Sequence, residues 1–216
     1  MSGVDPHAEV AVHRAGAALD DAEGAVVALH GRGATADGML DLLREGDPTE
    51  GRLAHLAPQA AGRTWYPQSF LAPTTANEPH LSSALGAVER TVERAAAAVG
   101  RERTVLVGFS QGACLASEYA ARHATRYGGL VALSGGLIGE DVERDRYGES
   151  LEGTPAYLGC SDVDPHIPAE RVSETAAVLE TLGASVEVQL FPGMGHRVNR
   201  EELDALRDRL RAVAGA

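Results

Sequence analysis

One stretch, residues 104–124, constrains the fold more than any other part of the chain. It begins with an apolar, β-branched run at 104–107, continues as Gly-Phe-Ser-Gln-Gly at 108–112, and ends in an alanine-rich segment. This order predicts a buried strand, a sharp turn and a buried helix. The two glycines leave space where a Cβ would meet backbone, so the side chain of Ser110 is expected to stand clear of the sheet.

This turn supplies two candidate chemical groups. Ser110 is the candidate nucleophile, and Gln111 follows at the start of the predicted helix, where free backbone N–H groups can receive a developing oxyanion. The alternative is a turn without chemistry, because a chain with 25 glycines can carry this five-residue pattern by chance. The rest of the chain has to decide between the two.

The remaining sequence alternates between strand-like and helix-like segments. Such alternation predicts an α/β protein with a mostly parallel central sheet that has helices on both faces. The predicted strands cover 8–13, 25–29, 53–58, 104–107, 129–134, 155–159 and 186–191, and the predicted helices cover 39–44, 80–99, 169–182 and 201–213, besides the helix that ends near residue 124.

The domain organisation follows from the length of 216 residues. No linker or internal repeat divides the chain, so we expect residues 1–216 to form one domain. The sheet and its helices use nearly all of this length, which leaves no separate lid domain. Residues 135–154 read as a polar, charged connection that is mostly solvated and carries no chemistry.

Composition excludes several classes of partner and location. A formal net charge of −12 argues against nucleic acids and anionic membrane surfaces, which require basic patches. No signal peptide and no apolar run near the roughly 20 residues of a membrane span are found, so a soluble cytoplasmic protein is expected. The two cysteines, Cys114 and Cys160, are either a disulfide or two buried thiols, and a reducing compartment favours buried thiols.

A second glycine-containing turn follows the predicted strand at 25–29. The sequence His-Gly-Arg-Gly-Ala at 30–34 leads from that strand toward a helix, at the sheet edge where α/β proteins place their ligands. The backbone N–H of Arg32 is the expected second donor for an oxyanion. The alternative is a plain turn in which His30 is satisfied by backbone.

A long loop at 58–79 contains four prolines and three of the few aromatic residues of the chain, Trp65, Tyr66 and Phe70. A loop of this length inside a compact domain usually has a function. The aromatic residues could form a hydrophobic cluster under the loop. We favour the interpretation that they form the wall of a substrate pocket.

Ser110, Asp164 and His196 occur in the order in which enzymes of the α/β-hydrolase fold arrange nucleophile, acid and base. Each follows a predicted strand. His196 lies between the last strand and the last helix, next to a glycine that gives its ring room to approach the serine.

Asp162 is the alternative acid, two residues nearer the strand. We favour Asp164 because Pro165 biases it away from helix and lets the carboxylate reach sideways. The segment 162–166 also contains two aspartates and a histidine, but no further ligand cluster accompanies them, so a metal is not expected.

Four motifs resemble the phospholipase/carboxylesterase family of α/β-hydrolases, which includes acyl-protein thioesterases and small bacterial carboxylesterases. They are HGRGA at 30–34, GFSQGA at 108–113, SDVDPHIP at 161–168 and FPGMGH at 191–196. The resemblance covers nearly the whole chain, with all four motifs in matching order.

The resemblance implies roles for five residues. Ser110 is the nucleophile, Asp164 the acid and His196 the general base, while the N–H groups of Arg32 and Gln111 form the oxyanion hole. It further implies acyl transfer in two steps through an acyl-serine, without any cofactor.

Two departures from the eukaryotic thioesterases favour small esters. The first loop reads HGRG where those thioesterases usually have HGLG, and WYPQSF at 65–70 is closer to a bacterial branch. We therefore expect a serine carboxylesterase for short- to medium-chain acyl or aryl esters. The alternatives are an acyl-protein thioesterase or lysophospholipase-type hydrolase, and an inactive hydrolase-fold binding protein. The expected partner is a small-molecule ester, and the sequence does not decide between a monomer and a homodimer.

Overall fold

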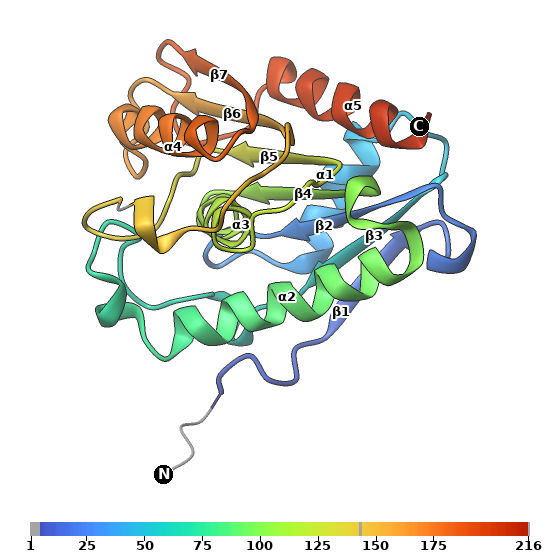
Figure 1. Ribbon diagram of the computed structural model, residues 1–216, viewed down its shortest axis with the longest axis horizontal. Helices are drawn as coiled ribbons and strands as arrows, with labels where there is room; N and C mark the ends of the chain where they lie inside the picture. The colour runs from blue at the N-terminus through green and yellow to red at the C-terminus, as the bar shows by residue number, and fades with distance from the viewer. Residues whose placement is uncertain (1–4, 143, 216) are drawn as a thin grey trace.

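A seven-stranded sheet forms the centre of the computed structural model, which describes residues 5–142 and 144–215 (Figure 1). The strand order is β1-β3-β2-β4-β5-β6-β7, and every neighbouring pair is parallel except β1 with β3. The strands are β1 (Val12–Gly16), β2 (Gly24–Leu29), β3 (Leu53–Pro58), β4 (Thr104–Phe109), β5 (Gly129–Leu133), β6 (Pro155–Ser161) and β7 (Ser185–Phe191).

Five α-helices of the described chain cover both faces of this sheet. They are α1 (Ala36–Gly46), α2 (His80–Val99), α3 (Gln111–Arg122), α4 (Ala169–Thr181) and α5 (Arg200–Ala214). Helices α2, α3 and α4 bury one face in a first hydrophobic core, and α1 and α5 bury the other in a second (Figure 1). The central strands are buried on both faces, which explains their uninterrupted apolar sequences. The predicted mostly parallel sheet with helices on both faces is confirmed, and no separate lid domain is evident among the described residues.

Local sequence signals work best at α2. This helix begins and ends at the residues that the sequence predicts. Its apolar residues at three- and four-residue steps, among them Leu81, Val88 and Val92, are buried. Gly100 follows with a φ of 86°, a conformation that ends a helix at little steric cost for glycine.

The predicted position of the first strand is wrong by several residues. It was expected at 8–13 and lies at Val12–Gly16, at the antiparallel edge of the sheet. The preceding segment is held by side-chain contacts instead. The backbone N–H of His7 donates to Ser83 Oγ at 2.7 Å, and the buried His7 ring hydrogen-bonds the carbonyl of Trp65 at 2.9 Å.

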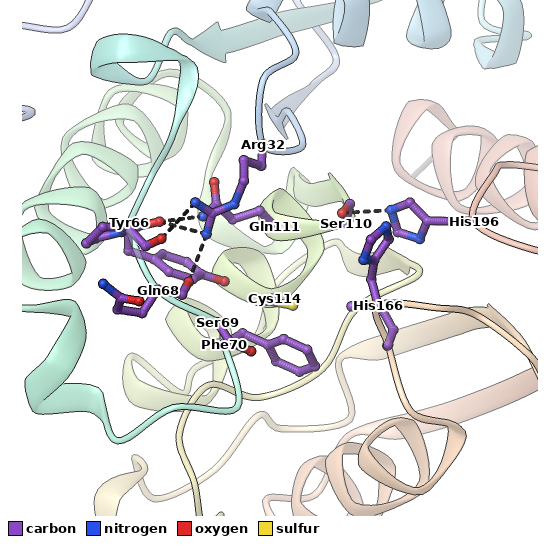
Figure 2. Close-up of a pocket in the computed structure, with 12 residues that line it drawn as sticks. Arg32, Tyr66, Gln68, Ser69, Phe70, Ser110, Gln111, Cys114, His166 and His196 are labelled. Atoms are coloured by element: carbon purple, nitrogen blue, oxygen red, sulfur yellow. Dashed lines mark hydrogen bonds between the residues drawn. The ribbon is translucent and has the colours of Figure 1, made fainter.

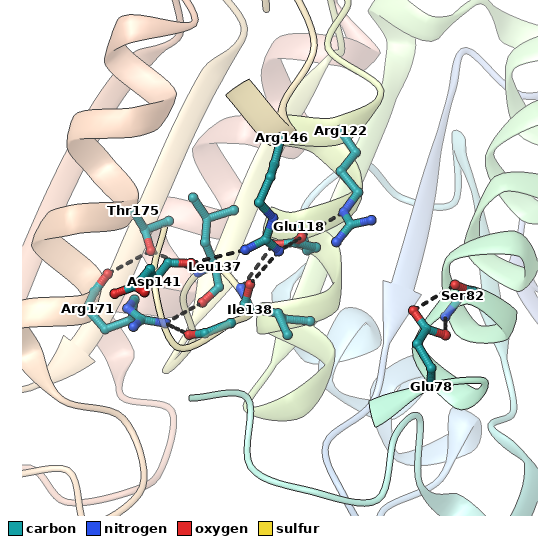
Figure 3. A network of polar contacts seen from close by, with 11 residues as sticks. Glu78, Ser82, Glu118, Arg122, Leu137, Ile138, Asp141, Arg146, Arg171 and Thr175 are labelled. Carbon is teal, nitrogen blue, oxygen red and sulfur yellow. Dashed lines mark hydrogen bonds and ion pairs between the residues drawn. The ribbon is translucent and has the colours of Figure 1, made fainter. Parts of the chain in front are cut away.

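The prediction that 135–154 is a mostly solvated connection is also wrong for its first part, because residues 135–139 are buried. Leu137 and Ile138 of this part belong to the first hydrophobic core. Figure 3 shows a second contact: Glu118 on α3, whose side chain is buried, lies beside Ile138. It accepts the N–H of Ile138 at 2.9 Å and pairs with Arg122 and Arg146. A buried carboxylate needs such partners, so the backbone of Ile138 and the side chain of Arg146 are held against α3.

Candidate active site

Ser110 lies in the turn between β4 and α3, with φ 54° and ψ −121°, a backbone conformation that residues other than glycine rarely adopt. A Cβ at Gly108 would lie 2.3 Å from the carbonyl oxygen of Gly112, and one at Gly112 would lie 2.0 Å from that of Leu29. The turn therefore requires both glycines. The N–H of Ser110 donates to the carbonyl of Leu133 on β5 at 2.9 Å, which fixes the strained residue to the sheet.

Three residues from separate loops meet at the carboxyl edge of the sheet. The Oγ of Ser110 lies 2.9 Å from Nε2 of His196, and Nδ1 of His196 lies 2.7 Å from Oδ2 of Asp164 (Figure 2 shows the first contact). Asp164 follows β6 and His196 follows β7. The structure thus brings together the three residues that the sequence predicts as nucleophile, acid and base.

The carboxylate of Asp164 is completely buried and fully hydrogen-bonded. Its Oδ1 accepts the N–H groups of His166 at 2.8 Å and Ile167 at 3.1 Å. Burial by itself would raise the pKa of Asp164, but the hydrogen bonds from His196 and from these N–H groups outweigh it and hold the pKa below its usual value. An ionised Asp164 keeps the N–H of His196 on Nδ1 and leaves Nε2 as an acceptor for the serine proton.

Asp162, the alternative acid, has a different contact. Its Oδ1 accepts the N–H of Gly193 at 2.8 Å and so braces the loop that carries His196.

The N–H groups of Arg32 and Gln111 have no hydrogen-bond partner within 5–142 and 144–215. Both residues line the same pocket as Ser110. The loop that carries Arg32 and the turn that carries Ser110 are in close contact, because a Cβ at Gly31 would lie 3.3 Å from Cβ of Ser110. Two unpaired donors beside a serine hydroxyl are the arrangement that an oxyanion requires.

His30 is satisfied by backbone, as the plain-turn interpretation predicts. Its Nε2 accepts the N–H of Ala60 at 3.1 Å, which leaves Nδ1 to donate to the carbonyl of Gly31 at 2.8 Å. Burial lowers the pKa of His30, so the ring is neutral and structural.

The pocket around Ser110 is open to solvent and has a volume of about 490 Å³. Among the described residues no carboxylate lines it, although the chain carries 31 acidic residues. The lining residues are Arg32, Tyr66, Pro67, Gln68, Ser69, Phe70, Ser110, Gln111, Cys114, His166, Ile167 and His196 (Figure 2).

A model of the phospholipase/carboxylesterase family matches residues 16–214. The chain belongs to the phospholipase/carboxylesterase family. Members of this family are named carboxylesterases and acyl-protein thioesterases, and the fold of the chain is that of the α/β-hydrolases.

Solved structures of this family share the whole fold. The phospholipase/carboxylesterase from Dyadobacter fermentans is 36% identical, with a TM-score of 0.90, over 94% of this chain and 97% of that one. The Bacillus cereus carboxylesterase superimposes with a TM-score of 0.75 over 95% of each chain, and its 20% identity supports the fold alone.

Curated relatives of the family are named acyl-protein thioesterase 1. The Gibberella zeae protein is 34% identical over 112 residues, which are 51% of this chain and 48% of that protein. The chain spans about half the length of the first curated relatives it matches. The alignment with the Yarrowia lipolytica protein is longer, at 26% identity over 82% of this chain and 86% of that one.

Trp65 does not line the pocket, which corrects the expectation for one of the three aromatic residues. Its side chain is 0% exposed, its Nε1 donates to the carbonyl of His30 at 2.9 Å, and its ring lies against the rings of His30 and His7. Burying the largest apolar side chain of the loop under the site is favourable. Tyr66 and Phe70 do belong to the lining.

Six lining residues were missed from the sequence: Pro67, Gln68, Ser69, Cys114, His166 and Ile167. Cys114 lies one helical turn after Ser110, and that spacing was an available signal. His166 stands edge-on to His196, with ring centroids 4.9 Å apart. The position of His166 directly after Asp164-Pro165 was also an available signal that it lies beside the predicted acid and base.

Both cysteines are free and buried, as predicted. Burial raises the pKa of each thiol to about 12, so neither is a thiolate near neutral pH. In the part of the chain that the structure describes, no group of three or more His, Cys, Asp or Glu residues is arranged to hold a metal ion. None of the helices in the described ranges has the length and apolarity needed to cross a bilayer.

Proposed function

We propose that this chain is a serine carboxylesterase that hydrolyses short- to medium-chain acyl or aryl esters through an acyl-serine. One observation carries the proposal: the continuous hydrogen-bond chain from Ser110 through His196 to Asp164 at an open pocket. Family membership supports the reaction type, and the pocket supports the substrate class.

The first step is attack of Ser110 Oγ on the ester carbonyl carbon while His196 Nε2 takes the hydroxyl proton. The negative charge that develops on the carbonyl oxygen is bound by the N–H groups of Arg32 and Gln111. Collapse of this intermediate breaks the ester bond, and His196 returns its proton to the departing alcohol. Asp164 stabilises the imidazolium throughout.

The second step releases the acyl group. A water molecule loses a proton to His196 and attacks the acyl-serine carbon, and the same two N–H groups bind the second oxyanion. Collapse returns the proton to Ser110 and frees the carboxylic acid. Every proton moves between Ser110, His196, the substrate and water, so the cycle uses no cofactor.

The pocket walls support a preference for short to medium acyl chains. Tyr66, Phe70, Cys114 and Ile167 are each less than a tenth exposed, so they present little apolar surface to a ligand. Each methylene gains at most about 0.8 kcal/mol, and only where it meets such surface. Apart from Pro67 the remaining lining residues are polar, so longer chains would extend along Gln68, Ser69 and His166 or into water.

The test combines active-site labelling with a substrate series. A fluorophosphonate should add its mass to the peptide that contains Ser110, and Ser110→Ala should abolish both labelling and turnover. Turnover of p-nitrophenyl esters from acetate to palmitate should rise over the short chains and then level off or fall. Labelling at another residue, or ester turnover that survives in Ser110→Ala, contradicts the mechanism.

A second candidate function is supported by the names of the curated relatives. An acyl-protein thioesterase would turn over palmitoyl thioesters, assayed beside the p-nitrophenyl series, better than any short ester of that series. A hydrolase-fold binding protein would turn over neither class.

A further inference from the structure

Residues 65–68 cross the pocket edge as irregular backbone, without the hydrogen-bond ladder of a strand or helix. Backbone polar groups that leave water need other partners. In this segment the partners are side chains: the His7 ring binds the carbonyl of Trp65, and Asn77 Oδ1 accepts the N–H of Gln68. The other two side chains belong to the residues that line the pocket with an unpaired N–H, Arg32 and Gln111.

The first side chain is that of Arg32. Its Nη1 donates to the carbonyl of Pro67 at 2.9 Å, and its Nη2 donates to the carbonyls of Tyr66 at 3.0 Å and Gln68 at 2.8 Å (Figure 2). One planar guanidinium thus binds three consecutive carbonyls, a geometry that the fixed fork of arginine permits and a lysine ammonium does not reproduce.

The second side chain is that of Gln111. Its Oε1 accepts the N–H of Trp65 at 2.9 Å, and its Nε2 donates to the carbonyl of Tyr66 at 2.8 Å. The carbonyl of Tyr66 therefore accepts from both Arg32 and Gln111. Segment 65–68 connects the two loops that carry the unpaired N–H groups.

The backbone around Arg32 needs such support. Arg32 stands between two glycines, and Gly33 has a φ of 77°, so local backbone preference restrains this loop weakly. On the side of Gly33 the loop is anchored by the hydrogen bond from the Gly33 N–H to the carbonyl of Arg63 at 2.7 Å, and on the side of Gly31 by the bonds of its carbonyl with His30 and Ala34. Arg32 forms no ion pair among the described residues, so its side-chain contacts are those with the three carbonyls.

We propose that Arg32 is a positioning residue: by binding the carbonyls of Tyr66, Pro67 and Gln68, its guanidinium fixes its own backbone N–H beside Ser110. The inference rests on the proposed function, because it assigns that N–H to the oxyanion. Misplacement of the donor weakens the bond to the transition state and leaves ground-state binding of the ester nearly unchanged.

The test compares Arg32→Met and Arg32→Lys with wild type. Arg32→Met keeps the length of the side chain and removes all three hydrogen bonds, and Arg32→Lys keeps only the charge. Removing an oxyanion donor outright lowers kcat about 10²- to 10³-fold. We expect Arg32→Met to lower kcat on p-nitrophenyl acetate roughly 10- to 100-fold, with KM changed less than about threefold. Arg32→Lys should restore less than half of this loss on a logarithmic scale.

A second measurement separates positioning from general support of the fold. A trifluoromethyl ketone forms a tetrahedral adduct whose oxyanion occupies the same hole, so its affinity should fall by the same factor as kcat. The matched control is Arg52→Met, since Arg52 also donates to backbone carbonyls, those of Thr49 and Ala214, away from the pocket. Its kcat and inhibitor affinity should match wild type.

Several results would overturn the inference. They are a wild-type kcat and inhibitor affinity in folded Arg32→Met, a loss confined to KM, and full rescue by Arg32→Lys. If Arg32→Met does not fold, Arg32→Gln, which retains one amide donor, takes its place with the same expectations. Wild type without Ser110-dependent turnover would instead overturn the proposed function, and this inference with it.

Discussion

The guanidinium of Arg171 lies over the ring of Phe70, with its central carbon 5.9 Å from the ring centroid. The same guanidinium donates to the carbonyls of Leu137 and Gly139 at 3.0 and 2.8 Å, and Gly139 in turn donates its N–H to the carbonyl of Phe70 at 2.7 Å. One arginine on α4 therefore holds a wall of the pocket to the buried segment shown in Figure 3.

This relationship predicts a joint loss of stability and selectivity in Arg171→Met. The carbonyls of Leu137 and Gly139 lose a charged donor, so the free energy of unfolding should fall by about 2–3 kcal/mol. The ring of Phe70 loses its cover, so kcat/KM should fall further for aryl esters than for acetates. Urea denaturation and a substrate series measure the two effects. In the control Arg211→Met, which removes an exposed pair with Asp208, both should change little.

The two aspartates after β6 should differ sharply in their effect on turnover. Asp164→Asn removes the acceptor that orients and stabilises the imidazolium of His196, so kcat should fall at least about a hundredfold. Asp162→Asn retains an oxygen that can accept the Gly193 N–H, so kcat should stay within about threefold of wild type. Steady-state kinetics of both variants on one ester checks this, and the reverse ranking would make Asp162 the acid.

Trp65 and Phe70 should differ in how their substitution affects a substrate series. Trp65→Phe deletes the hydrogen bond to His30 and leaves a cavity under the site, so the free energy of unfolding should fall by about 2 kcal/mol. Its kcat/KM should change by one common factor for all esters. Phe70→Ala removes wall surface and should depress longer or aromatic esters about tenfold relative to acetate. Chain-length selectivity in Trp65→Phe would return that side chain to the pocket wall.

Glu202 should make stability depend on pH. Its side chain is buried, and burial raises its pKa from 4.5 to about 7, against the hydrogen bond from the Asn199 N–H and with help from the charges of Glu201 and Asp164. Between these two values the folded chain holds a proton that the unfolded chain has released. The contribution of Glu202 to stability therefore falls as the pH rises through this window.

The isosteric variant Glu202→Gln isolates this effect, because it stays neutral and can still accept the Asn199 N–H. Its free energy of unfolding relative to wild type should increase by about 2–3 kcal/mol between pH 5 and pH 8. Urea denaturation at four pH values measures the difference. A constant difference across this range would mean that Glu202 titrates at its ordinary value.

Local sequence patterns determined much of the fold. The spacing of apolar residues in 80–99 predicts both ends of α2, and the glycines around Ser110 predict the strand-turn-helix that holds it. The order of Ser110, Asp164 and His196 predicts that three distant loops meet. These signals succeed because the steric requirements of a turn and the period of a buried face act between residues close in sequence.

Only the tertiary structure decided where irregular segments point. Nothing local distinguishes Trp65, which is buried under the site, from Tyr66, which lines the pocket. The segment 135–139 is buried where Leu137 and Ile138 meet the core and the Ile138 N–H meets the carboxylate of Glu118, and the contacts of Arg32 with 66–68 join residues more than 30 positions apart. The direction of a side chain on irregular backbone is set by whichever distant partner satisfies its polar groups and fills its space, and a periodic pattern does not encode that partner.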